Sequence, residues 1–313
     1  MTTMDQSRVS TSRPAPRTPD VSLRGVARRF GDVVALDGVD LTLGPGEVVG
    51  FVGPNGSGKT TTVRVLLGLL RPTSGRATVR GWDCWQQSQQ VHHLVGYVPA
   101  EPGLDPRLTG WQVMRRSRRL RGGTDDGRAE EVARRLDLDL GVRVGDASRG
   151  TRQKLAVVLA LAHRPAVLLL DEPTTGLDPV SQREFHRLVG EQTAAGGSAL
   201  LCSHVLSEVE QTADRVVVLR AGQVVAEGTP AQLRARSPFR VRARLGTSMP
   251  YELLRDLPGA ADVRVEGDWV QCAVPPAALP ALCARLAEHG VLDLECGQDD
   301  LEQSVLAWYR EHR

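Results

Sequence analysis

Residues 46–61 read GEVVGFVGPNGSGKTT and are the most informative part of the chain for its fold class. It begins as a short apolar strand, continues as a glycine-rich loop, and is followed by residues 60–70, which have helical spacing. Gly53, Gly56 and Gly58 let the backbone curl so that successive N–H groups converge on an anion. The helix that begins near Gly58 presents the positive end of its dipole to the same point. Strand, loop and helix in this order predict a phosphate-binding loop.

The loop also carries the side chains that phosphate and magnesium binding requires. Between Gly53 and Thr60 every position of the pattern G-x-x-x-x-G-K-[ST] is filled. In such a loop the Lys59 ammonium reaches the β- and γ-phosphates, and the Thr60 hydroxyl can ligate Mg²⁺. The alternative is an ordinary glycine-rich turn before a helix, but such a turn would not need every position of the motif to be filled. The sequence therefore predicts a site for ATP and Mg²⁺ whose nucleotide-binding residues are Gly53, Pro54, Asn55, Gly56, Ser57, Gly58, Lys59, Thr60 and Thr61.

A second motif supplies acidic groups at a strand end. Residues 168–174 read LLLDEPT, an apolar strand that delivers Asp171 at its carboxyl end. Because α/β sheets bind ligands at that edge, Asp171 is expected beside the phosphate loop, where it can hold Mg²⁺ through water. Glu172 points elsewhere and is suited to act as general base on the attacking water. A strand that ends in Asp-Glu is common by itself, and it gains significance from the phosphate loop.

His204 ends the sequence LLCSH, which is a further predicted strand. A lone histidine is more often structural than catalytic. At a strand end on the nucleotide edge, however, its ring can contact the γ-phosphate and orient the water. We therefore predict that Glu172 and His204 are the catalytic residues.

Composition narrows the class of protein. The chain has 313 residues and a formal net charge of +2, which gives no argument for nucleic acid or an anionic membrane surface as a partner. The apolar residues 155–170 are interrupted by His163, Arg164 and Pro165, so they do not predict a membrane-spanning helix. Residues 1–20 predict a disordered tail rather than a signal peptide. The five scattered cysteines are expected to be reduced thiols. We expect a cytoplasmic protein.

The remaining pattern predicts an α/β protein in two parts. Residues 21–43 alternate with period two and predict an antiparallel, hairpin-rich start, whereas residues 105–163 are predicted to be mainly helical. Strands and helices then alternate up to residue 228, which is typical of a parallel sheet covered by helices. After residue 237 the order β-α-β-β-α-β predicts a small α+β, ferredoxin-like domain. We therefore expect two domains after the tail, 21–236 and an accessory or regulatory unit at 237–313.

Residues 146–178 read DASRGTRQKLAVVLALAHRPAVLLLDEPTTGLD. A phosphate loop, a helical segment, this stretch and a strand that ends in His204 resemble, in this order, the ATP-binding subunits of ABC transporters. The resemblance covers about residues 21–228. It implies a P-loop ATPase cassette with an antiparallel β subdomain, a parallel-sheet core and a helical subdomain. It also implies that two subunits pair head to tail and enclose two ATP molecules between them.

The resemblance identifies residues 147–151 with the family's LSGGQ signature. The serine and the second glycine are kept, whereas Ala147, Arg149 and Thr151 depart from it. The signature opens a helix whose N-terminus meets the γ-phosphate of ATP held by the other subunit. The residues expected to make that contact are Ser148, Arg149, Gly150 and Gln153.

Three further positions follow from the resemblance. Asp178 matches the D-loop that links the two nucleotide sites. Phe30 matches the aromatic residue that stacks on adenine, although an ordinary apolar strand-end residue is the plainer interpretation. Family members usually carry a glutamine where this chain has Ala100, and that glutamine touches Mg²⁺ and senses the membrane partner. Ala100 cannot ligate anything, so either Glu101 or a water takes its place.

Residues 95–110, VGYVPAEPGLDPRLTG, resemble the type-2 exporters of drugs, antibiotics and lipids. The implied function is an ATPase subunit that powers such an exporter through a separate transmembrane permease, with a second copy as its partner, on the inner face of the cell membrane. An importer ATPase is one alternative. A soluble ABC ATPase that acts on ribosomes or nucleic acid is another, but the single cassette and the lack of sustained heptads disfavour it. The basic run in residues 113–123 predicts a solvated helix face or a docking surface.

Overall fold

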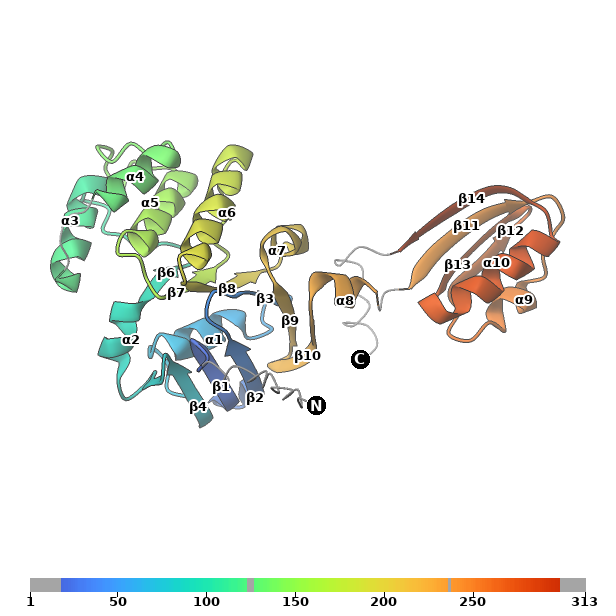
Figure 1. Cartoon of the computed structure of the whole chain (residues 1–313), viewed down its shortest axis with the longest axis horizontal. Coiled ribbons are helices and arrows are strands. Elements are labelled where there is room, and N and C mark those ends of the chain that lie inside the picture. The colour runs from blue at the N-terminus through green and yellow to red at the C-terminus, as the bar shows by residue number, and fades with distance from the viewer. Residues whose placement is uncertain (1–17, 123–126, 236–237, 299–313) are drawn as a thin grey trace, which may run out of the picture.

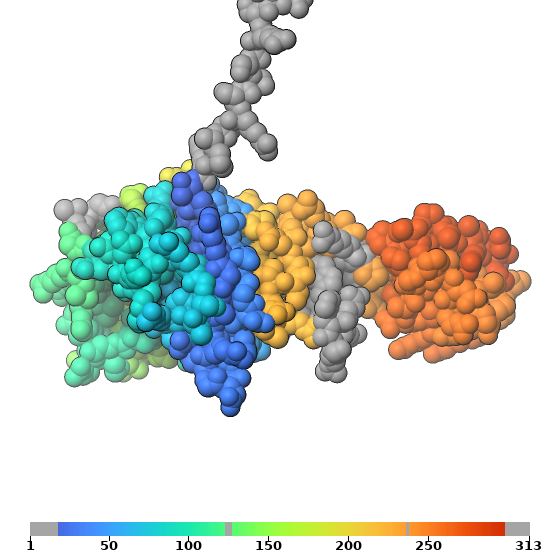
Figure 2. Space-filling model, turned by 90° about the horizontal axis from the view of Figure 1, so that it is seen from below, coloured from blue at the N-terminus to red at the C-terminus, as the bar shows by residue number. Residues whose placement is uncertain are grey.

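The computed structural model describes residues 18–122, 127–235 and 238–298. The predicted tail lies almost wholly outside these residues. Figures 1 and 2 both show a larger body with a smaller C-terminal one projecting from its end. A membrane-spanning helix would need a longer and more apolar segment than any of the described helices provides.

The larger body is built on a six-stranded sheet with the order β10-β9-β3-β8-β7-β6. Five strands run parallel, and β10 pairs with β9 antiparallel. Every residue of β3 and β7 is buried, as expected for strands covered on both faces. The predicted parallel core is therefore confirmed. Its strands are β3 (Val48–Val52), β6 (Val95–Val98), β7 (Val167–Asp171), β8 (Ser198–Ser203), β9 (Arg215–Arg220) and β10 (Gln223–Gly228).

A four-stranded antiparallel sheet forms the predicted hairpin-rich start. The first two strands pair from Val21 opposite Leu43 to Phe30 opposite Val33. Helix α1 (Lys59–Leu66) lies between this sheet and the parallel one, and a single apolar cluster joins all three. The strands, in the order β2-β1-β4-β5, are β2 (Val33–Leu43), β1 (Val21–Phe30), β4 (Ser74–Val79) and β5 (Trp82–Asp83).

The predicted helical segment is confirmed as α3 (Gly110–Arg121), α4 (Arg128–Arg135) and α5 (Arg149–Leu161). Thr109 caps α3 through a capping box with Gln112, and Ser148 caps α5. Figure 1 shows these helices grouped beyond β6 and β7, next to α6. The remaining helices of the larger body are α2 (Ser88–Leu94), α6 (Pro179–Ala194), α7 (Leu206–Thr212) and α8 (Pro230–Arg234).

The C-terminal body is an antiparallel sheet of order β12-β13-β11-β14, covered on one face by helices. Its apolar cluster includes no residue of the larger body. The element order is the one that the sequence predicted, while the ferredoxin-like class and the domain boundaries stay predictions. The elements are β11 (Phe239–Leu245), α9 (Tyr251–Arg255), β12 (Ala261–Glu266), β13 (Trp269–Val274), the 3-10 helix η1 (Pro276–Ala278), α10 (Leu279–Glu288) and β14 (Val291–Gln298).

The separate clusters predict that the two bodies can be destabilised independently. Leu254 on α9 is fully buried in the C-terminal cluster, so Leu254→Ala should cost about 2–5 kcal/mol of unfolding free energy there. The neighbouring Leu253 is 40% exposed, and Leu253→Ala is the matched control. Hydrogen exchange should show faster opening of residues 238–298 in the first variant alone, with ATP affinity unchanged. Loss of ATP binding in Leu254→Ala would contradict the separation.

Candidate active site

The phosphate loop is formed as the sequence predicts. Strand β3 ends at Val52, and α1 begins at Lys59 after the loop. Gly56 and Gly58 have φ angles of +82° and +113°, in the region that favours glycine. A Cβ on Gly58 would also lie 2.7 Å from the carbonyl oxygen of Ala35. The loop conformation therefore depends on glycine at this position for two separate reasons.

Lys59 lies inside the curve of this loop. Its side chain is 6% exposed, and its Nζ donates to the carbonyl oxygen of Gly53 at 2.6 Å and to that of Pro54 at 3.4 Å. The same nitrogen lies 3.8 Å from Oε1 of Glu172. The structure thus brings together two residues that the sequence placed in separate motifs, and it puts the cation next to the predicted general base.

Asp171 ends β7 at the same edge of the sheet. It is 1% exposed, and its Oδ1 is buried without a hydrogen-bond partner among the described residues. Burial raises the pKa of this carboxyl, while the hydrogen bond from the Thr60 hydroxyl and the charge of Lys59 lower it. A cation beside Oδ1 would offset the cost of that buried acceptor. Because Mg²⁺ prefers oxygen ligands, Asp171 and Thr60 fit this ion.

Glu172, the residue after Asp171, has an unusual backbone conformation. Its φ is +51°, and its N–H donates to the carbonyl oxygen of Cys202 at 2.9 Å. Its Oε2 lies 2.6 Å from Nδ1 of His204. An ionised carboxylate can only accept, so in this contact the histidine ring donates. Glu172 is therefore oriented by His204 on one oxygen and faces the Lys59 ammonium with the other.

The signature turn lies at the surface of the helical segment. Oγ of Ser148 accepts from the N–H of Thr151 at 3.0 Å and caps α5, and both Ser148 and Arg149 are exposed. Gly150 packs so tightly that a Cβ there would lie 2.4 Å from the carbonyl oxygen of Gly176. The N-terminus of α5 is thus open outward and is packed inward against the loop that follows Glu172. Its contact with ATP on another subunit stays a prediction.

Gln153 corrects one expectation. It was expected to contact ATP together with the signature turn, but its side chain is 1% exposed and points into the subunit. Its Nε2 donates to the carbonyl oxygens of Pro173 at 3.0 Å and Pro99 at 3.3 Å. A side chain buried in this way is not available to a nucleotide on a partner, so the prediction was wrong for this residue.

Asp178 and Phe30 have neighbours that the sequence did not reveal. Asp178 caps α6 and accepts from the hydroxyl and N–H of Ser181, and these bonds, with Lys154 at 3.4 Å, hold the pKa of its carboxyl well below the usual range. Phe30 is 44% exposed, and the guanidinium of Arg28 lies 4.5 Å from its ring centroid. Adenine could stack only on the opposite face of Phe30 unless Arg28 moved.

The chain matches the ABC transporter family over residues 36–175. It is 41% identical over 222 residues to the daunorubicin resistance ATP-binding protein DrrA3 of Streptomyces coeruleorubidus, which is 69% of this chain and 70% of that protein. The Nod factor export ATP-binding protein I of Cupriavidus metallidurans is 37% identical, over 69% of this chain and 73% of that one. A solved ATP-binding subunit of an ABC transporter has a TM-score of 0.66 at 28% identity, over 69% of this chain and 92% of that one.

The chain belongs to the ABC transporter family of ATP-binding proteins. It is thus an ABC ATPase, whose family binds and hydrolyses ATP to power transport. The antiparallel sheet, the parallel core and the helical segment described above are the parts of the ABC cassette.

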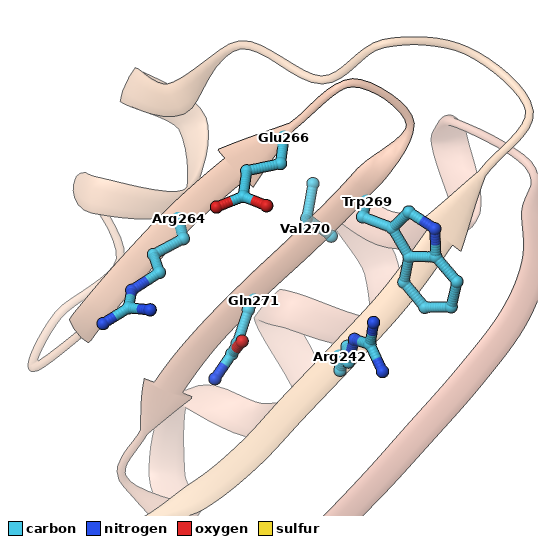
Figure 3. Close-up of a pocket in the computed structure, with 6 residues that line it drawn as sticks. All are labelled: Arg242, Arg264, Glu266, Trp269, Val270 and Gln271. Atoms are coloured by element: carbon cyan, nitrogen blue, oxygen red, sulfur yellow. The ribbon is translucent and has the colours of Figure 1, made fainter.

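Two features of this ABC ATPase lie outside the motifs. Ala100 follows β6, and its neighbour Glu101 is exposed and makes no hydrogen bond or ion pair within the described residues. A hollow of about 200 Å³ lies on the open face of the C-terminal sheet, where the guanidinium of Arg242 stacks 4.2 Å from the ring centroid of Trp269 (Figure 3). Its other lining residues are Arg264, Glu266, Val270 and Gln271.

The chain offers a matched test of nucleotide binding, since it contains two lysines. Lys59→Met removes the cation from the phosphate loop and should weaken ATP binding about 10- to 100-fold, the range for a lost charge-assisted hydrogen bond. Lys154→Met removes the other lysine, which pairs with Asp178 at 3.4 Å, and should leave the affinity of the single subunit unchanged. Fluorescent nucleotide titration measures both. Equal affinities in the two variants would refute the assignment of Lys59.

Proposed function

We propose that this protein is the ATP-hydrolysing subunit of an exporter whose transport path is formed by separate permease subunits. The observation that carries the proposal is the convergence of Lys59, Asp171, Glu172 and His204 at one edge of the parallel sheet. The phosphate loop, an acidic strand end and a histidine at the next strand end are the groups that one subunit contributes for cleaving a phosphate anhydride with water.

In the proposed hydrolysis, the loop N–H groups and Lys59 bind the phosphates of ATP. Asp171 and Thr60 would hold Mg²⁺, which supplies positive charge for the leaving phosphate oxygens. Glu172 takes the proton from the attacking water, and its 2.6 Å contact with His204 supports this use because it fixes the direction of the carboxylate. His204 is 54% exposed, so its ring is also accessible to a γ-phosphate.

A second copy of the chain is proposed to complete each site. Ser148, Arg149 and Gly150 lie at a helix N-terminus, which favours a phosphate by its dipole and its N–H groups. Ser148 and Arg149 are exposed at this helix end, which supports a head-to-tail pair. ATP would then contact both subunits only when the pair is closed, so binding closes the pair and hydrolysis opens it.

The names of the relatives support the inferences on the export direction and on the membrane partner. One is named for daunorubicin resistance and another for Nod factor export, and both are named as ATP-binding proteins. We infer a drug, antibiotic or lipid as the cargo and a location on the inner face of the membrane through the permease. The exposed apolar side chains of α3 support a docking surface there, with Trp111 43% and Leu120 77% exposed among arginines.

Glu172→Gln tests the catalytic assignment. Removal of a general base should lower kcat for ATP about 100- to 10,000-fold, while ATP still binds because the phosphate loop is intact. The variant should therefore accumulate an ATP-dependent dimer, which gel filtration detects. Glu252→Gln, on α9 of the C-terminal body, is the matched change and should keep normal turnover. Turnover by Glu172→Gln at the rate of Glu252→Gln would exclude Glu172 as the base.

A further inference from the structure

Gln153 joins three segments that are distant in sequence. It lies in the second turn of α5, the helix that Ser148 caps. Its Nε2 carries two hydrogens, and it donates to Pro173 at 3.0 Å and to Pro99 at 3.3 Å. Pro173 directly follows Glu172, and Pro99 directly follows β6. One amide group therefore fixes α5 to the turn that contains Glu172 and Pro173, here called the catalytic turn, and to the loop that contains Ala100.

The hydrogen bond from Gln153 is important for the catalytic turn because the backbone of this turn is strained. The backbone of Glu172 has a φ of +51°, which is strained for a residue with a side chain. Strained backbone persists when neighbouring bonds hold it from several sides. The bond from the Glu172 N–H to Cys202 at 2.9 Å holds the turn from β8, and the bond from Gln153 to Pro173 holds it from α5. The carboxylate direction of Glu172 depends on both.

The amide of Gln153 is not what fold stability alone would favour. Its Oε1 is buried and has no hydrogen-bond partner among the described residues, and an unpaired buried acceptor destabilises a fold. Gln192 on α6 offers a comparison: it is also buried, at 8% exposed, and its Nε2 donates to the carbonyl oxygen of Pro165 at 2.7 Å. Gln192 braces a loop that carries none of the proposed catalytic groups.

We propose that Gln153 is a positioning residue for ATP hydrolysis, which holds the Glu172 turn in its strained conformation and ties it to the signature helix. This inference rests on the proposed function of Glu172. It means that the helix whose N-terminus is offered to the partner's nucleotide is bonded directly to the turn that carries the base for the subunit's own nucleotide. Gly150 against Gly176 and Lys154 against Asp178 bind the same helix to the remainder of that loop.

The test compares Gln153→Met with Gln192→Met in the full-length protein. Each change removes one buried amide and keeps a side chain of similar length, so both variants should lose similar thermal stability. Only Gln153→Met should lose turnover, with kcat at least tenfold below that of Gln192→Met and the KM for ATP within twofold. A kcat within twofold of Gln192→Met, or a loss that lies in KM, would overturn the inference.

Gln153→Glu keeps the proposal testable if Gln153→Met does not fold. As a carboxylate, residue 153 would repel the two carbonyl oxygens, whereas as a protonated acid it can donate to one of them. Its kcat, divided by that of the wild type at each pH, should therefore rise as the pH falls. A flat ratio would contradict the positioning by hydrogen bonds. Hydrolysis by the wild type in the same assays distinguishes failure of the proposed function from failure of the inference about Gln153, because a wild type without turnover overturns the proposed function itself.

Discussion

Lys59 sits in a glycine-lined curve, bonded to the Gly53 carbonyl at 2.6 Å and facing Glu172 at 3.8 Å. This position requires a parallel sheet, because only parallel strands bring the loop after β3 and the acidic end of β7 to the same edge. The carboxylate that faces Lys59 belongs to Glu172, whose backbone has a strained φ of +51°. The phosphate loop, the acidic end of β7 and the proposed general base therefore all lie around Lys59.

Most of this edge could be predicted from sequence, because each motif is local. The phosphate loop needs glycines at set spacings, and the acidic pair follows an apolar strand directly, so residue order alone predicted Lys59, Asp171 and Glu172. The parallel core followed from the alternation of strands and helices. The contact between Lys59 and Glu172 is a different kind of fact, since it joins residues more than a hundred positions apart and depends on strand order.

Gln153 shows where local reasoning failed. It follows the signature closely in the chain, and that proximity suggested a shared contact with nucleotide. Position on a helix, however, is decided by phase: Gln153, Val157, Ala160 and Leu161 share the buried face of α5, whereas Ser148 caps its exposed end. The helical spacing of these apolar residues was a signal that could have placed Gln153 inside. The contact of Arg28 with the ring of Phe30 could likewise have been predicted, because residues two apart on a strand share a face.

We propose that this ATPase powers a membrane protein other than itself. Affinity purification of the chain from detergent-solubilised native membranes, with mass spectrometry of the proteins that accompany it, would identify that partner. If the proposal is right, a multi-span membrane protein is recovered in stoichiometric amount. Recovery of the chain from the soluble fraction alone, with ribosomes, nucleic acid or nothing attached, would contradict it.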